Sequence, residues 1–259
     1  MALSSSFNAR GAWSIYVREL MRAMRTAFQS ILSPVLTTSL YFIVFGTVIG
    51  SRMEPVDGVA YGAFIIPGLL MLTLLGETTS NSSFGIYMPR FTGTIYELLS
   101  APVGVAETLV GFVGAAATKG LILAAIILGT ATLFVDYEIK YPLAAFAYIM
   151  LVAASFSLFG FILGLWADSF EKLGIIPLLF LTPLTFLGGT FYSIDDLPGI
   201  WSTIAYANPI AFLVSGLRWT FYGTSDVSIW VSLSLTLGFL TVCVGVIAFI
   251  FKTGWRLRE

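Results

Sequence analysis

Six apolar segments dominate this sequence, and each is long enough to cross a lipid bilayer. A spanning α-helix needs about 20 mostly apolar residues. The segments that meet this requirement are 31–50, 59–79, 107–134, 143–166, 173–191 and 229–251. Because backbone polar groups within lipid must be satisfied internally, such segments fold as helices. The sequence therefore predicts an all-α membrane protein with six transmembrane helices.

The composition agrees with this prediction and excludes several functions. Charged residues make up 10% of the chain, against about 25% in soluble domains. A net charge of −1 gives no basic surface for nucleic acid. The chain has no histidine, one cysteine and no glycine-rich nucleotide-binding pattern. We therefore expect no catalytic residues, no metal site and no cofactor on this chain.

The first 30 residues are polar and form a separate predicted unit, with residues 31–259 as a single transmembrane domain. Aromatic and apolar residues follow one another at helical spacing in residues 7–29, between basic residues. The basic residues include Arg18, Arg22 and Arg25, and the apolar ones include Trp13, Tyr16 and Val17. Such a basic amphipathic helix lies in the membrane interface. The alternative is a solvated helix of an N-terminal extension.

A polar stretch at 87–104 separates the second and third apolar segments. Thr94 and Glu97 have the spacing of a capping box, and Pro102 stops a helix that begins there. Ile95, Leu98 and Leu99 then share one helical face. This pattern predicts a short amphipathic helix at the membrane surface, within about 88–102. An ordinary loop with one helical turn remains the alternative.

A second semi-polar stretch, about 193–228, lies before the last apolar segment. Two short helices, 197–205 and 209–222, fit its pattern. Neither is suited to be a full span, because Arg218 and several Ser, Thr and Asn residues interrupt the stretch. We expect a re-entrant helical hairpin that protein or a water-filled cavity covers.

Lysine and arginine counts set the expected orientation, because cytoplasmic segments carry an excess of both. With the N-terminus inside, nine such residues lie in the cytoplasm and three outside. The inside set is Arg10, Arg18, Arg22, Arg25, Arg90, Lys172, Lys252, Arg256 and Arg258, and the outside set is Arg52, Lys140 and Arg218. Both termini and the 87–104 stretch are then cytoplasmic, and the hairpin is external.

Two ionisable residues fall inside the apolar segments. Glu77 lies near the cytoplasmic end of the second segment and Lys119 midway along the third. Such residues line a pathway, form an interhelical pair or snorkel to the interface. Pro67, Pro177 and Pro183 are expected to bend or break the second and fifth segments.

The order of these elements resembles the membrane subunit of a type-2 ABC transporter, in the branch of the YadH-like and NodJ-like permeases. The resemblance covers essentially the whole chain. It rests on Phe45-Gly46, Gly50-Ser51-Arg52, FIIPG at 64–68, ELLSAPV at 97–103, LTPLTFLGGTFY at 181–192, Asn208–Ile210, Ser215-Gly216 and Arg218. No single piece is specific, but their order and spacing are.

The resemblance implies an exporter of the bacterial inner membrane, with membrane lipid around it. Such permeases form dimers, and each copy binds a cytosolic ATPase subunit that carries the ATP and magnesium. The helix within 88–102 would be the coupling helix, docking through Arg90, Thr94, Ile95, Tyr96, Glu97 and Leu98, and the N-terminal helix would add Arg18, Arg22 and Arg25.

The family's pathway would run between spans 1, 2 and 5 at the dimer interface. Its candidate lining residues here are Thr37, Tyr41, Phe45, Glu77, Thr182 and Phe186. Family substrates include saccharides, lipid-linked saccharides and amphipathic drugs, and aromatic and hydroxyl side chains suit all of them.

Two other functions compete with this interpretation. An ion-gradient-driven secondary transporter usually shows internal repeats and paired intramembrane charges, and this sequence shows no clear repeat. A membrane-embedded lipid-modifying enzyme would need a convergent catalytic set, which the sequence does not offer.

Overall fold

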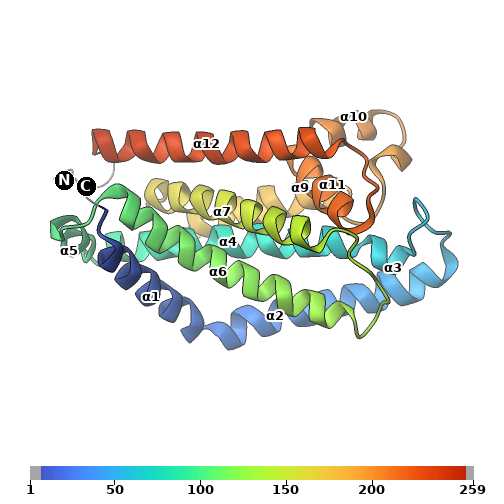
Figure 1. The fold of residues 1–259 in the computed structure, drawn as a ribbon, viewed down its shortest axis with the longest axis horizontal. Helices are drawn as coiled ribbons and strands as arrows, with labels where there is room; N and C mark the ends of the chain where they lie inside the picture. The colour runs from blue at the N-terminus through green and yellow to red at the C-terminus, as the bar shows by residue number, and fades with distance from the viewer. Residues whose placement is uncertain (1–6, 255–259) are drawn as a thin grey trace.

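The computed structural model describes residues 7–254, apart from the side chains of Ala27 and Leu99, and this part of the chain is helical (Figure 1). The helices are α1 (Ala9–Arg25), α2 (Ala27–Tyr41), α3 (Tyr61–Phe64), α4 (Ile66–Phe91), α5 (Ile95–Ser100), α6 (Val105–Ala131), α7 (Pro142–Trp166), α8 (Phe170–Ile176), α9 (Thr182–Leu187), α10 (Ile200–Ala207), α11 (Pro209–Tyr222) and α12 (Ile229–Thr253). Wider π-helical turns, Phe42–Ile49 and Pro177–Leu181, continue α2 and join α8 to α9. Single 3-10 turns lie at Gly50–Arg52 and Ile194–Asp196.

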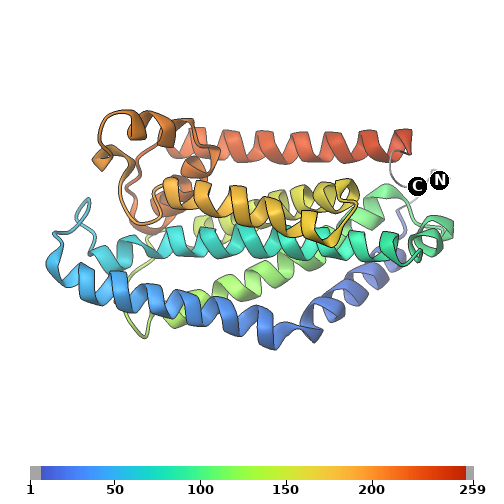
Figure 2. The ribbon, with the colours of Figure 1, turned by 180° about the vertical axis from the view of Figure 1, so that it is seen from behind.

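The predicted six-span architecture is confirmed within these residues. The spans are Phe28–Arg52, Tyr61–Phe91, Val105–Ala131, Pro142–Trp166, Phe170–Leu187 and Ile229–Thr253. They lie along the long axis of the molecule, with α5, the start of α1 and the end of α12 at one end and α3 and α10 at the other (Figures 1 and 2). Arg256 and Arg258 of the expected cytoplasmic set lie outside the described residues, because these end at Gly254.

The second span is longer than predicted, since it ends at Phe91 and not near residue 79. The polar residues Asn81, Ser82 and Ser83 follow the predicted end. In the structure, Ser82 and Ser83 are buried, because this part of the helix packs against α7 within the protein. The polar residues therefore face neighbouring helices, and the helix continues past them.

Helix α4 lies at the centre of the bundle. In the second span, which contains α4, 78% of the most apolar 18-residue stretch is buried inside the protein. The same share is 11% for the first span and 22% for each of the fifth and sixth spans. The main core cluster contains Ile66, Leu70 and Leu74 of α4, with Val152 of α7 and Val214 of α11. The first, fifth and sixth spans therefore expose most of their apolar surface.

Two glycines bring α7 close to α4. A Cβ atom added at Gly160 would meet the backbone of Thr79, and one added at Gly164 would meet the backbone of Ser83. Small residues at this spacing allow close helix approach within membranes. Two glycines four residues apart are a weak signal in a glycine-rich chain. Here, Gly160 and Gly164 lie at the contact between the second and fourth spans, which are the most buried of the six.

The spans that contain the predicted proline breaks are irregular. Pro177 begins the π-helical turn between α8 and α9, and Pro67 lies in the first turn of α4, just after α3 ends at Phe64. The first span also widens into a π-helical path after Tyr41. Local π-helical turns are frequent at functional sites.

The hairpin predicted before the last span consists of α10 and α11, which meet at Asn208 with a bend of 82°. Arg218 of α11 is 1% exposed. It is held by an ion pair of 2.7 Å with Asp226, by the Gly189 carbonyl that accepts from it, and by the Phe64 ring 3.9 Å from its guanidinium carbon. A buried arginine is thus tied to three separate segments at one end of the bundle.

Candidate functional site

A cavity of about 380 Å³ lies between the first, second and fifth spans. Five of the six predicted pathway residues line it, together with Ser33, Thr38, Thr73 and Ser80. The five are Thr37 and Tyr41 of α2, Glu77 of α4, and Thr182 and Phe186 of α9. The first, second and fifth spans therefore line a space that contains hydroxyl groups, one carboxylate and aromatic rings.

The sixth predicted residue, Phe45, lies just beyond this cavity in an aromatic cluster. Its ring centre is 4.7 Å from that of Phe191 and 6.1 Å from that of Tyr41. Phe186 lies 5.3 Å from Phe191 and 6.5 Å from Tyr41, again between ring centres. Of these four rings, Tyr41 and Phe186 line the cavity, and Phe45 and Phe191 pack beside them. Rings at such distances attract each other weakly and are easily rearranged.

The two intramembrane charges pair with each other. Lys119 Nζ of α6 lies 3.4 Å from Glu77 Oε2 of α4. The lysine side chain is 6% exposed and the glutamate 29%, because the glutamate faces the cavity. Of the open alternatives for these residues, the interhelical pair is the one the structure contains.

A second polar cluster lies one helical turn from this pair. Glu19 of α1 is 3% exposed and pairs with Arg22 at 2.7 Å and Arg18 at 3.3 Å. Arg22 donates to both the carbonyl and the side-chain oxygen of Asn81 on α4, each at 3.2 Å. Asn81 follows Glu77 by four residues, so the two polar clusters share one face of α4.

The N-terminal helix α1 packs against α6 of the bundle. Tyr16 donates to Thr118 of α6 at 3.0 Å, and Gly111 of α6 is in contact with Ile15. Arg22 therefore serves an internal contact, while the Arg18 side chain is 57% exposed and Arg25 is exposed. Residues 1–6 of the predicted N-terminal unit lie outside the described residues.

The predicted surface helix exists as α5, but the capping box predicted for it is wrong. Thr94 makes no side-chain cap, because its hydroxyl bonds Thr92 at 3.0 Å instead. Ile95 is 4% exposed and packs into a core cluster with Ile15 and Phe112. It therefore anchors α5 from within and does not present itself to another protein.

Arg90 also has an internal role. It lies in the last turn of α4, where its guanidinium donates to the carbonyls of Gly164 at 3.0 Å and Leu165 at 2.6 Å. These carbonyls are at the end of α7, where no intrahelical donors remain. Tyr96, at 55% exposure, and Glu97 are the exposed members of the predicted docking set on α5, and Leu98 is half-buried.

Sequence reasoning missed Glu107, whose carboxylate links the start of α6 to the start of α1. The Glu107 carboxylate accepts from the backbone N–H of Asn8 at 2.8 Å and of Gly104 at 2.9 Å. It thereby caps α6 and fixes the start of α1. The glutamate three residues after Gly104 is the available signal for the cap. A cleft of about 360 Å³ lies between α1 and α5, lined by Asn8, Gly11, Arg18, Glu97 and Leu98 among others.

The opposite end of the molecule carries an open acidic cavity of about 1010 Å³. Its lining includes Glu54, Asp57, Asp195, Asp196 and Asp226. Asp195 accepts from the Tyr206 hydroxyl, and this bond raises the pKa of Tyr206 to about 12. Within residues 7–254, no three His, Cys, Asp or Glu side chains are grouped so that they could hold a metal ion.

Comparison with known proteins identifies the family. Residues 10–222 match the ABC-2 type transporter family. The chain belongs to this family. It is 34% identical to the inner membrane transport permease YadH of Escherichia coli K12 over 246 residues, which cover 95% of this chain and 96% of that protein. It is 25% identical to nodulation protein J of Rhizobium meliloti, covering 95% and 92%, and of Rhizobium leguminosarum bv. viciae, covering 95% and 93%.

Family membership settles the coarse function. This ABC-2 chain is a multi-pass membrane permease subunit of an ABC transporter. Members of the family work with an ATPase partner and often dimerise. The ion-gradient-driven and enzymatic alternatives therefore fall away, and the cavity between the first, second and fifth spans becomes the candidate translocation site.

Proposed function

We propose that two copies of this chain form the membrane part of an exporter in a bacterial inner membrane, powered by a separate cytosolic ATPase. The exported substrate is amphipathic or saccharide-like. The ATPase binds at the end of the molecule that carries α5 and the start of α1. The observation that supports this most directly is the exposed, rigidly mounted helix α5 at that end, in a chain of the ABC-2 type family.

The orientation places α5 and both termini in the cytoplasm. Segments at this end hold most of the lysine and arginine residues of the chain, whereas the other end carries the acidic cavity. Cytoplasmic segments of membrane proteins are enriched in basic residues. ATP and magnesium would then act on the ATPase polypeptide, and this chain would carry neither.

The cleft between α1 and α5 gives the ATPase a mixed surface. Glu97 and Arg18 contribute opposite charges to its wall, and the exposed ring of Tyr96 stands on α5 beside it. Aromatic residues surrounded by polar groups are frequent energetic centres of protein interfaces. We expect Tyr96 and Glu97, rather than Arg90 or Ile95, to provide most of the docking contact.

The contacts that hold α5 explain how a movement of the ATPase would be transmitted to the cavity. Ile95 fixes α5 to α1 and α6 through the shared apolar cluster, and Glu107 links the start of α6 to the start of α1. From α1, Glu19 and Arg22 reach α4 at Asn81, one turn from Glu77 in the cavity wall. Packed elements joined in this way move as rigid bodies and not residue by residue.

The cavity lining supports the substrate class. Hydroxyl groups of Thr37, Thr73 and Thr182 and the ring of Tyr41 line one space with Glu77. Since Lys119 balances the charge of Glu77, the wall is close to neutral. Hydroxyl and aromatic groups without net charge suit a sugar or an amphipathic molecule better than an inorganic ion.

The second copy would cover the exposed faces of the first and fifth spans. Leu36 and Leu40 of α2 and Leu178, Leu179 and Phe180 beside α9 are all more than half exposed. These residues flank the cavity, so pairing of two copies through them would enclose it.

Affinity purification with the ATPase tests this proposal. A Tyr96→Ala, Glu97→Lys double variant should lose ATPase binding by about 30-fold or more, since a central interface residue contributes roughly 2 kcal/mol. The control is Trp201→Ala, because Trp201 is an aromatic residue of nearly equal exposure, 54%, on α10 at the other end. Full binding by the double variant, or equal loss in the control, would contradict the proposed docking site.

A further inference from the structure

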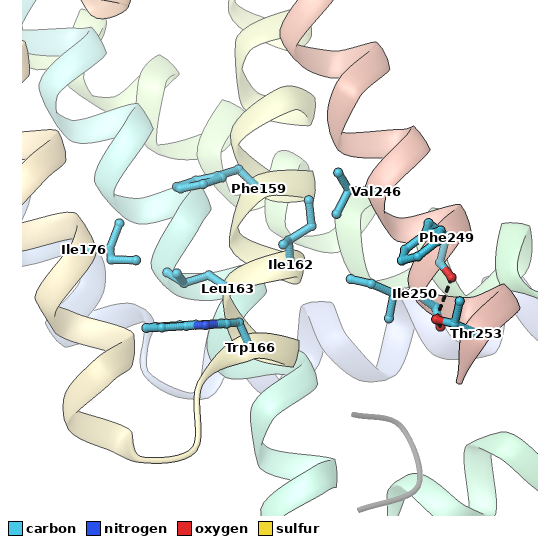
Figure 3. A pocket seen from close by; sticks show the side chains of 9 residues that line it. All are labelled: Phe159, Ile162, Leu163, Trp166, Ile176, Val246, Phe249, Ile250 and Thr253. Carbon is cyan, nitrogen blue, oxygen red and sulfur yellow. Dashed lines mark hydrogen bonds between the residues drawn. The ribbon is translucent and has the colours of Figure 1, made fainter. Parts of the chain in front are cut away.

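The cytoplasmic-end halves of α7 and α12 leave a second hollow, of about 740 Å³, that the transport cavity does not include. We call it the apolar groove. Its lining is Phe159, Ile162, Leu163 and Trp166 of α7, Ile176 of α8, and Val246, Phe249, Ile250 and Thr253 of α12. Figure 3 shows these side chains around one open space, with Ile176 and Trp166 on one side and Phe249 on the other.

The lining offers almost nothing to a polar ligand. Its one hydroxyl, on Thr253, donates to the backbone carbonyls of Phe249 at 2.9 Å and Ile250 at 3.2 Å. Apart from the indole N–H of Trp166, the remaining side chains are aliphatic or aromatic. A ligand for this groove is therefore hydrocarbon along most of its length, since a buried polar group without a partner costs several kcal/mol.

A neighbouring cavity extends the apolar groove along α12. A further cavity of about 440 Å³ shares Phe159 with it and continues between α12, α9 and α11. Together the two cavities touch α12 from Ser234 to Thr253, a distance of roughly 28 Å at 1.5 Å per residue. One leaflet accounts for about half of the hydrocarbon core, roughly 15 Å, so the two cavities together are long enough to hold one acyl chain of a lipid in that leaflet. The shape suits an extended acyl chain.

Cationic and aromatic side chains mark the mouth of the groove at the end near the termini. Lys172 Nζ lies 5.5 Å from the ring centre of Trp166 and 2.7 Å from Asp168. Lys252 is exposed and adjoins Thr253 in the last turn of α12. Tryptophan and lysine are typical of the headgroup layer, and an ammonium group has three donors to share.

We propose that the apolar groove binds one acyl chain of an anionic phospholipid, whose phosphate lies against Lys252 and Lys172. The lipid fills the space where α12 diverges from α7 and so supports the weakly packed last span. In the orientation proposed above, this lipid belongs to the cytoplasmic leaflet, which carries the anionic lipids of many membranes. Only that leaflet assignment rests on the proposed function.

Native mass spectrometry of the purified, full-length protein tests this directly. The protein is incubated with phosphatidylglycerol or phosphatidylcholine of equal chain length, and retained lipid per chain is counted. A Val246→Trp variant places a large ring in the groove. Each buried methylene strengthens binding roughly fourfold, so excluding two of them should lower retention on the order of tenfold. The control is Val242→Trp, one turn away and 63% exposed.

The headgroup contact has its own control. Lys252→Gln should remove the preference for phosphatidylglycerol over phosphatidylcholine without abolishing retention, and Lys140→Gln, at the other end of the bundle, should not. Equal retention by both Val→Trp variants would show only general lipid coverage and overturn the proposal. Crosslinking of a Val246→Cys variant to itself would also overturn it, because a second copy would then cover the groove. Neither result depends on transport or ATPase binding.

Discussion

The pair of Glu77 and Lys119 allows a quantitative prediction, because its two members differ in exposure. The lysine side chain is 6% exposed inside the bundle, whereas the glutamate is 29% exposed on the cavity wall. Glu77→Gln leaves an uncompensated charge on the buried lysine, which also lies in the field of Arg22. Lys119→Gln leaves a charge on a carboxylate that cavity water can reach.

The expected destabilisation is therefore unequal. Removing one partner of a buried pair costs about 3–5 kcal/mol, and we expect Glu77→Gln to lower the free energy of unfolding by about 3 kcal/mol. Lys119→Gln resembles the loss of a partly solvated pair and should cost about 1 kcal/mol. A double variant, Glu77→Gln with Lys119→Leu, removes both charges and therefore leaves no unpaired charge in the bundle. It should recover to within about 1 kcal/mol of the wild type.

The assay is reversible unfolding of the purified protein in mixed detergent micelles, followed by circular dichroism. Glu77→Gln keeps the side-chain volume, whereas Lys119→Gln also shortens a buried side chain, so the predicted asymmetry has to hold in spite of the packing that Lys119→Gln loses. Equal effects of the two single variants, or a larger effect of Lys119→Gln, would refute the asymmetry of solvation. A double variant as unstable as Glu77→Gln would refute the claim that a stranded lysine is the cause.

Three further stability predictions use the same assay. Gly164→Ala should lower the free energy of unfolding by about 1–3 kcal/mol, since its new Cβ meets the α4 backbone. Its control, Gly129→Ala in open space on α6, should be neutral or stabilise by up to about 1 kcal/mol. Equal effects of the two variants would refute the close contact between α7 and α4. Asp226→Asn should cost about 3 kcal/mol by stranding buried Arg218, whereas a change below about 0.5 kcal/mol would show that the pair is dispensable. Glu107→Ala removes both backbone contacts of that carboxylate, so we expect the free energy of unfolding to fall by about 2 kcal/mol. Proteolysis at the N-terminus should also become faster, and unchanged proteolysis would show that other contacts hold α1.

The lining of the cavity could be predicted in large part through the family resemblance. Thr37, Tyr41, Glu77, Thr182 and Phe186 were expected along a pathway through the family resemblance, and the structure brings all five to one cavity. Their directions within each helix follow from helical spacing. The pairing of Glu77 with Lys119 could not be predicted as such, because the sequence allows several partners or none for an intramembrane charge.

The docking helix shows the limit of pattern reasoning. Ile95 and Leu98 share a face with helical periodicity, and periodicity states only that this face is apolar. Whether the face meets a partner or the same chain depends on where α1 and α6 lie. The structure places Ile15 and Phe112 against Ile95, which turns a predicted docking residue into an internal anchor. Arg90 changes role for the same reason, since the end of α7 supplies its acceptors.

The sequence by itself determined the number of spans, the short helices between them and the family, because apolar length and local motifs are properties of contiguous residues. The tertiary structure alone decided which faces are buried. It extended the second span to Phe91, joined α1 to α6 through Glu107 and opened the groove between α7 and α12. These features depend on contacts between residues far apart in the chain, and no local pattern specifies which helix a polar or apolar face will meet.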